Sequence, residues 1–110
     1  MSDHYRTEIP GGVLYTKIAV SASGTLITGV SGKKIVVLSV WAIAASAVNV
    51  KFKTTTGSAD ITGLAYCAQN GGFVLPYNAC GWFATERGDS LLIDLSGSVA
   101  VGGSLSYVLV

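Results

Sequence analysis

Glycine divides this chain into short segments, and this constrains its fold more than any other sequence feature. The 14 glycines recur from Gly11 to Gly103. No segment between them has the apolar spacing of a helix, in which every third or fourth residue faces the core. Short segments bounded by glycine-containing turns are typical of all-β sandwiches and barrels. An all-β protein is therefore expected.

About eight short strands are predicted from these segments, with no helix between them. Neighbouring strands should pair antiparallel and form a β-sandwich, most simply of the jelly-roll type. Residues 1–12 are polar and end in Pro10-Gly11-Gly12, so they are predicted to be an extended N-terminal arm before a single domain over 13–110. The candidate strand segments are 14–21, 25–28, 33–44, 47–53, 60–65, 73–76, 81–85, 90–95, 99–101 and 104–110.

The segment 33–44 is apolar on both of its alternating faces. A strand with two apolar faces is usually covered on both sides. We expect the partner sheet to cover one face and another subunit to cover the other. The face that contains Val36, Leu38 and Val40 is the candidate subunit interface.

Charge is scarce, and this limits the classes of partner. Charged residues make up 12% of the chain against a typical share of roughly 25%, and the net charge is +1. Such a chain has no general electrostatic affinity for nucleic acid or for an acidic membrane. The longest apolar run, Ile35–Val48, is shorter than the roughly 20 residues of a membrane span. A nearly neutral, charge-poor surface favours association with other protein subunits.

Catalytic and metal-binding constellations are weak. The single histidine, His4, lies in the predicted arm, so no oriented base for a nucleophile is apparent. Glu86 and Asp89 flank a turn closely enough for a carboxylate pair, but the preferred interpretation is an ordinary polar turn. No enzyme activity, cofactor or metal is therefore expected. Cys67 and Cys80 are expected to be free thiols, with a disulfide across the turn at residues 70–72 as the alternative.

Aromatic residues are concentrated in one third of the chain, beside Asn70 and Asn78. Sugar-binding loops combine aromatic rings with amide groups, because pyranose faces stack on such rings. Subunit interfaces are enriched in the same aromatic residues. The candidate glycan-binding residues are Tyr66, Tyr77 and Trp82.

The second half of the chain contains a set of short motifs with two more upstream. They are the run 70–78 (NGGFVLPYN), Gly81-Trp82-Phe83, Gly88-Asp89-Ser90-Leu91 and the closing segment from Val99-Ala100-Val101-Gly102-Gly103 to Tyr107, with Gly32-Lys33-Lys34-Ile35 and Ala47-Val48-Asn49-Val50 upstream. These motifs resemble those of small virion proteins of tailed bacteriophages, and the resemblance covers about Gly24 to Val110. Cys67 and Cys80 are not part of that pattern.

The resemblance implies a structural protein of the virion, similar to jelly-roll head decoration (cement) proteins that clamp neighbouring capsomers. Its implied partners are copies of itself, as a trimer by preference or a dimer, and the major capsid protein. Its location would be the virion, assembled in the host cytoplasm. The arm could contact the capsid through Tyr5, Arg6 and Ile9. The alternative is a receptor-binding, carbohydrate-binding module of a tail or fibre.

Overall fold

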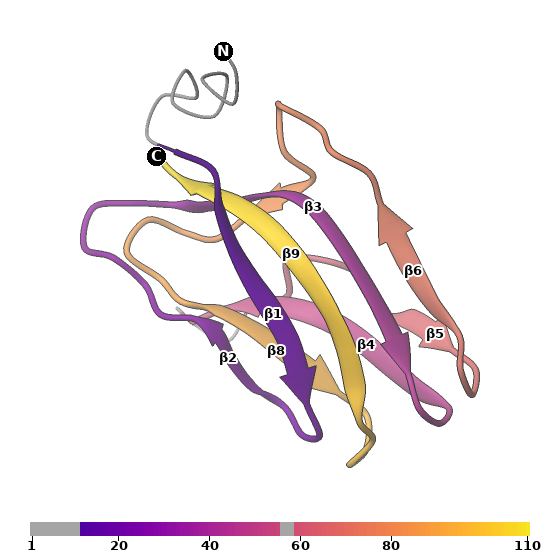
Figure 1. Ribbon diagram of the computed structural model, residues 1–110. Helices are drawn as coiled ribbons and strands as arrows, with labels where there is room; N and C mark the ends of the chain where they lie inside the picture. The colour runs from indigo at the N-terminus through magenta and orange to yellow at the C-terminus, as the bar shows by residue number, and fades with distance from the viewer. Residues whose placement is uncertain (1–11, 56–58) are drawn as a thin grey trace.

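The computed structural model describes residues 12–55 and 59–110, which form two antiparallel sheets packed face to face (Figure 1). Sheet A contains, in order, β1 (Leu14–Val20), β9 (Val101–Leu109), β3 (Ile35–Ala44) and β6 (Gly72–Leu75), and the short β7 (Phe83–Ala84) also pairs with β3. Sheet B contains, in order, β2 (Gly24–Ile27), β8 (Leu91–Leu95), β4 (Val48–Thr54) and β5 (Ala65–Cys67). The prediction of an all-β antiparallel sandwich is confirmed.

The strand pairs are nested in the way that defines a jelly roll. In sheet A, β1 pairs with β9 and β3 pairs with β6, while in sheet B β2 pairs with β8 and β4 pairs with β5. Along the chain, each pair encloses the next, from β1–β9 through β2–β8 and β3–β6 to β4–β5. Successive pairs alternate between the two sheets. The predicted number of strands agrees with these eight, and β7 is an added two-residue pairing at the edge of β3.

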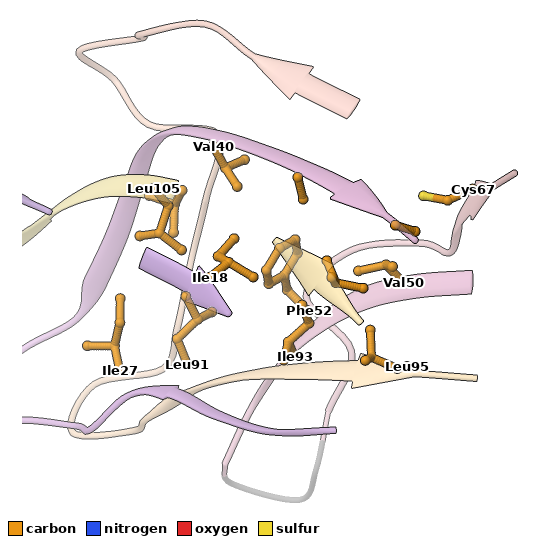
Figure 2. Close-up of a cluster of buried hydrophobic side chains, with 14 of the residues drawn as sticks. Ile18, Ile27, Val40, Val50, Phe52, Cys67, Leu91, Ile93, Leu95 and Leu105 are labelled. Carbon is orange, nitrogen blue, oxygen red and sulfur yellow. The ribbon is translucent and has the colours of Figure 1, made fainter. Parts of the chain in front are cut away.

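The core lies between the sheets and follows from strict alternation in the strands. In β4, Val48, Val50 and Phe52 are buried while the residues between them are half-exposed, and β8 alternates in the same way. Burial of each such side chain contributes about 1.5–3 kcal/mol. Figure 2 shows these residues meeting side chains from sheet A, including Ile18, Val40 and Leu105.

A β-bulge in β3 reverses which of its residues face the core. Val37 pairs with Tyr107 and Ser39 pairs with Ser106, so Leu38 is an extra residue in the strand. A one-residue insertion moves all following side chains to the opposite face. Val37 is therefore buried before the bulge and Val40 after it.

The predicted subunit interface on β3 is wrong, because its residues are covered within the single chain. Val40 belongs to the hydrophobic core, and Leu38 is buried with 3% of its surface exposed. Val36 is half-buried, and Gly81 lies directly over its side chain. The residues of β3 that face outward are instead Trp41 and Ile43.

The loop that follows β6 holds the bulge in place. The backbone amide of Asn78 donates to the Leu38 carbonyl oxygen at 2.9 Å, and the amide of Trp82 donates to the Val37 carbonyl oxygen at 2.8 Å. These bonds satisfy backbone groups next to the extra residue, which buried groups require. This loop, residues 76–82, contains Tyr77 and Trp82, and we call it the aromatic loop. Its hydrogen bonds help to set the register of β3.

Two strand boundaries differ from the prediction. The predicted strand at 60–65 is a single bridge at Asp60, and the strand begins only at Ala65. Gly102 and Gly103 do not interrupt the last strand, because β9 continues through them while paired with β1 and β3.

Gly103 and Gly72 allow the neighbouring strands to approach β3 closely. A Cβ atom at Gly103 would overlap the carbonyl oxygen of Trp41, and one at Gly72 would overlap the carbonyl oxygen of Ala42. Both obstructing atoms are backbone atoms of β3, so the side chain cannot be accommodated by a change of rotamer. These positions require glycine for space rather than for a positive φ.

Substitution of Gly103 by alanine should therefore destabilise the protein. We expect Gly103→Ala to lower the free energy of unfolding by about 2–3 kcal/mol, because the strands must separate to admit the Cβ atom. Urea denaturation followed by circular dichroism measures this change. Gly24→Ala is the matched control, since a Cβ atom at Gly24 has no neighbour within 4 Å. Equal stability of the two variants would contradict the close approach.

Candidate functional site

The outer surface of sheet A is the strongest candidate for a functional surface, and we call it the A face. Large apolar side chains project from it: Trp41 is 46% exposed, Ile43 50%, Val74 72% and Tyr15, on the edge strand β1, 60%. Two rows of the strand register cross its central part. They are Lys17, Ser104, Trp41 and Val74 in one row, and Ala19, Gly102, Ile43 and Gly72 in the other.

The outer surface of sheet B, the B face, has the opposite character. Lys51 lies at its centre, with its Nζ 3.2 Å from Asp60 Oδ1 and 3.9 Å from Asp94 Oδ2. Lys53 and Asn49 lie on the same side of β4. Among the residues that form the two rows of the A face, Lys17 alone is charged. The sandwich thus presents one charged face suited to water and one apolar face suited to contact with protein.

Hollows flank the apolar side chains of the A face. One, of about 430 Å³, lies between Trp41, Ile43 and Val74. A second, of about 590 Å³, lies on the other side of Ile43 and is lined by Ala19 and Gly102 among others. The A face is therefore uneven: Trp41 and Ile43 form a ridge, and the surface beside them is recessed.

An apolar groove of about 430 Å³ opens at the edge of the sandwich where β5 and β6 lie. Phe52 forms its inner wall, stacked on Phe83 at 5.0 Å between ring centroids and edge-on to Phe73 at 6.3 Å. Leu64 and Trp82, each 43% exposed, also line it. This groove offers apolar contact and few polar groups to orient a ligand.

The polar groups near this groove already have partners. The Trp82 indole Nε1–H donates to the Pro76 carbonyl oxygen at 2.7 Å. The Thr62 hydroxyl oxygen accepts the amide of Phe52 at 3.1 Å. Binding of a sugar requires polar groups that are available to its hydroxyls.

The three candidate glycan-binding residues do not line one surface. Trp82 lines the groove, whereas Tyr66 and Tyr77 do not. Tyr66 is 78% exposed and pairs with Asn49, which places it on the B face. Tyr77 is 62% exposed in the loop after β6. The structure thus gives these aromatic residues separate positions, and glycan binding stays a prediction.

In the turn at 86–89, the Asp89 carboxylate and the Glu86 backbone amide are part of the framework of the turn. Asp89 is buried, and its Oδ2 accepts the Thr54 hydroxyl at 2.6 Å. The same hydroxyl oxygen accepts the amide of Glu86 at 3.1 Å. Arg87 extends to the Gly32 carbonyl oxygen at 2.8 Å and connects this turn to the loop before β3. This network agrees with the interpretation of the segment as a structural turn.

The remaining candidates are placed as follows. Cys67 is buried at the end of β5, Cys80 is exposed, and both are free thiols. The candidate capsid-contact residues Tyr5, Arg6 and Ile9 lie outside the described residues. Over 12–55 and 59–110 there is no cluster of three His, Cys, Asp or Glu side chains fit to hold a metal ion. Nor does that part of the chain contain a helix long and apolar enough to cross a membrane.

Comparison of the chain with protein-family models, with curated proteins and with solved structures found no match. Its function is therefore inferred from its own surfaces.

The sequence interpretation missed the A face residues Trp41, Ile43 and Val74. For Trp41 and Ile43 the sequence contained a signal, because both faces of the segment 33–44 are apolar. The choice between those faces depends on the bulge at Leu38, which no local motif announces.

Thr54→Val tests the structural role of the turn. The substitution removes the hydroxyl bond to the buried Asp89 carboxylate and the acceptor for the Glu86 amide, so we expect a loss of about 2–3 kcal/mol in the free energy of unfolding. Thermal and urea unfolding measure it. Thr25→Val, at an exposed position of β2, should change stability by less than about 0.5 kcal/mol. A Thr54→Val protein as stable as this control would show that the network contributes little.

Proposed function

We propose that this chain is a structural subunit of a virus particle, and specifically a decoration protein on the capsid of a tailed phage. The observation that carries the proposal is the A face, a broad sheet surface with exposed Trp41, Ile43 and Val74. Contiguous apolar surface of this kind marks sites of protein–protein contact. The jelly-roll topology and the resemblance of the turn and strand motifs to phage virion proteins support the same conclusion.

Burial of the A face supplies the energy that such a role needs. Complete burial of an exposed apolar side chain contributes about 1.5–3 kcal/mol, and Trp41, Ile43 and Val74 are 46%, 50% and 72% exposed. A sandwich of short, well-paired strands loses little conformational freedom on docking, so more of this energy remains as affinity. A protein that binds only the assembled shell then stabilises it by mass action.

The proposed partners are copies of this chain and the major capsid protein, within the virion. The charge-poor A face suits contact between subunits, and the apolar groove beside β5 and β6 is a second surface able to receive a protein segment. In this role the chain has no catalytic site, cofactor or metal of its own.

The experiment compares particles of the encoding virus that contain the chain with particles from which its gene has been deleted. We expect the deleted particles to release their genome at a lower temperature, and addition of the purified chain to restore the temperature of release. Genome release is measured by fluorescence of a DNA-binding dye during heating. Mass spectrometry of purified particles provides the control for the presence of the chain.

Two results would contradict the proposal. In one, the chain is missing from purified particles of the wild-type virus. In the other, it fractionates with tails and binds a glycan, and this binding is lost in Trp82→Ala; that result would establish the receptor-binding alternative.

A further inference from the structure

The A face carries two complementary features on adjacent strands. On β3, Trp41 and Ile43 form the ridge. On β9, their partners in the register are Ser104 and Gly102, which we call the strip. The strip is lower than the ridge, because its side chains are a hydroxymethyl group and a hydrogen atom. A protruding pair of large residues thus lies directly beside a recessed pair of small ones.

We infer that a second copy of this chain docks on the A face, with the ridge of each copy over the strip of the other. The inference rests on the proposed function, since it assigns the A face to contact between copies and leaves the apolar groove at β5 and β6 for the capsid protein. A two-fold axis parallel to the strands and between β9 and β3 brings β3 of one copy opposite β9 of its partner. The arrangement is isologous, because one surface supplies both the ridge and the strip.

The rows of the A face fit this pairing residue by residue. Trp41 pairs with Ser104 in its own sheet, so the two-fold axis sets each Trp41 against the Ser104 of the other copy. Ile43 is set against Gly102 in the same way. The hollow beside Ile43, lined by Ala19 and Gly102, provides volume into which the opposing ridge can enter. Large residues then meet small ones at the centre of the contact, as close packing requires.

The area and the charge of the A face suit a second copy. The four strands of sheet A cover about 500 Å² at about 3.3 Å per residue and about 4.8 Å between strands. Two such faces together reach about 1,000 Å², which is the lower bound for a specific interface. Lys17 lies on the edge strand β1, so its ammonium group can extend into solvent and no like charges meet at the centre.

The decisive variant makes the A face more apolar while it fills the strip. In Ser104→Trp the ridge is intact, but a second large ring occupies the place that receives the ridge of the partner. We expect light scattering to give twice 11.3 kDa for the native chain and 11.3 kDa for Ser104→Trp, with a dissociation constant raised about 100-fold. Non-specific hydrophobic association would instead become stronger in Ser104→Trp. Reductant is present throughout because Cys80 is exposed.

Matched controls separate this effect from misfolding. Thr25→Trp adds the same ring on the B face and should remain a dimer. Trp41→Ser removes the larger side chain of the ridge and should weaken the dimer in the same direction as Ser104→Trp. Circular dichroism must show the same sheet content in every variant. If Ser104→Trp fails this check, Ser104→Gln replaces it, because it fills the strip with a smaller side chain.

Fluorescence gives an independent measurement. In Trp82→Phe, Trp41 is the remaining tryptophan, and its emission should shift to longer wavelength as dilution dissociates the dimer. In Trp41→Phe, the emission of Trp82 should not change on dilution.

Three outcomes overturn the inference. They are a native chain that is monomeric at every concentration, a native trimer, and a Ser104→Trp protein that remains dimeric. None of them decides the proposed function, which depends on whether the chain is found in virus particles and stabilises them. Absence from particles together with a dimer that Ser104→Trp disrupts would leave the interface established and the proposed function wrong.

Discussion

The extra residue in β3 governs the surface chemistry of the whole molecule. Without the bulge at Leu38, strict alternation from Val37 would carry Trp41 and Ile43 into the core and would turn Val40 and Ala42 outward. The space between the sheets could not hold an indole ring at the position now filled by small residues. One inserted residue, held by amide groups of the aromatic loop, thus selects both the packing of the core and the character of the A face.

The two faces of the sandwich differ in chemical character. On the B face, Lys51 lies between the carboxylates of Asp60 and Asp94. Such exposed pairs add little stability, since solvent screens them. The A face carries the apolar surface and little charge. In the proposed role, the A face is the main surface for contact with other subunits, and the apolar groove at β5 and β6 is a second, narrower one.

Much of the fold could be predicted from local sequence patterns. The alternation in 47–53 and 90–95 fixed the inner and outer residues of β4 and β8 correctly, and the glycine-containing turns indicated a sandwich. The candidate surface could not be predicted in the same way. Its residues depend on the bulge, and the bulge depends on hydrogen bonds from Asn78 and Trp82, some 40 residues away. Gly103 was predicted to interrupt the last strand for a similar reason, because its close approach to β3, rather than a turn, explains it.

The position of β9 between β1 and β3 has a consequence for the order of events in folding. Sheet A is divided until residues 101–109 enter it, because β1 and β3 have no pairing with each other. Contacts between strands so distant in the chain form late and slowly. The ridge belongs to β3 and the strip to β9, so the two lie side by side only after β9 is in place. In the proposed dimer, a chain that has not yet added β9 to its sheet would present the ridge without the strip.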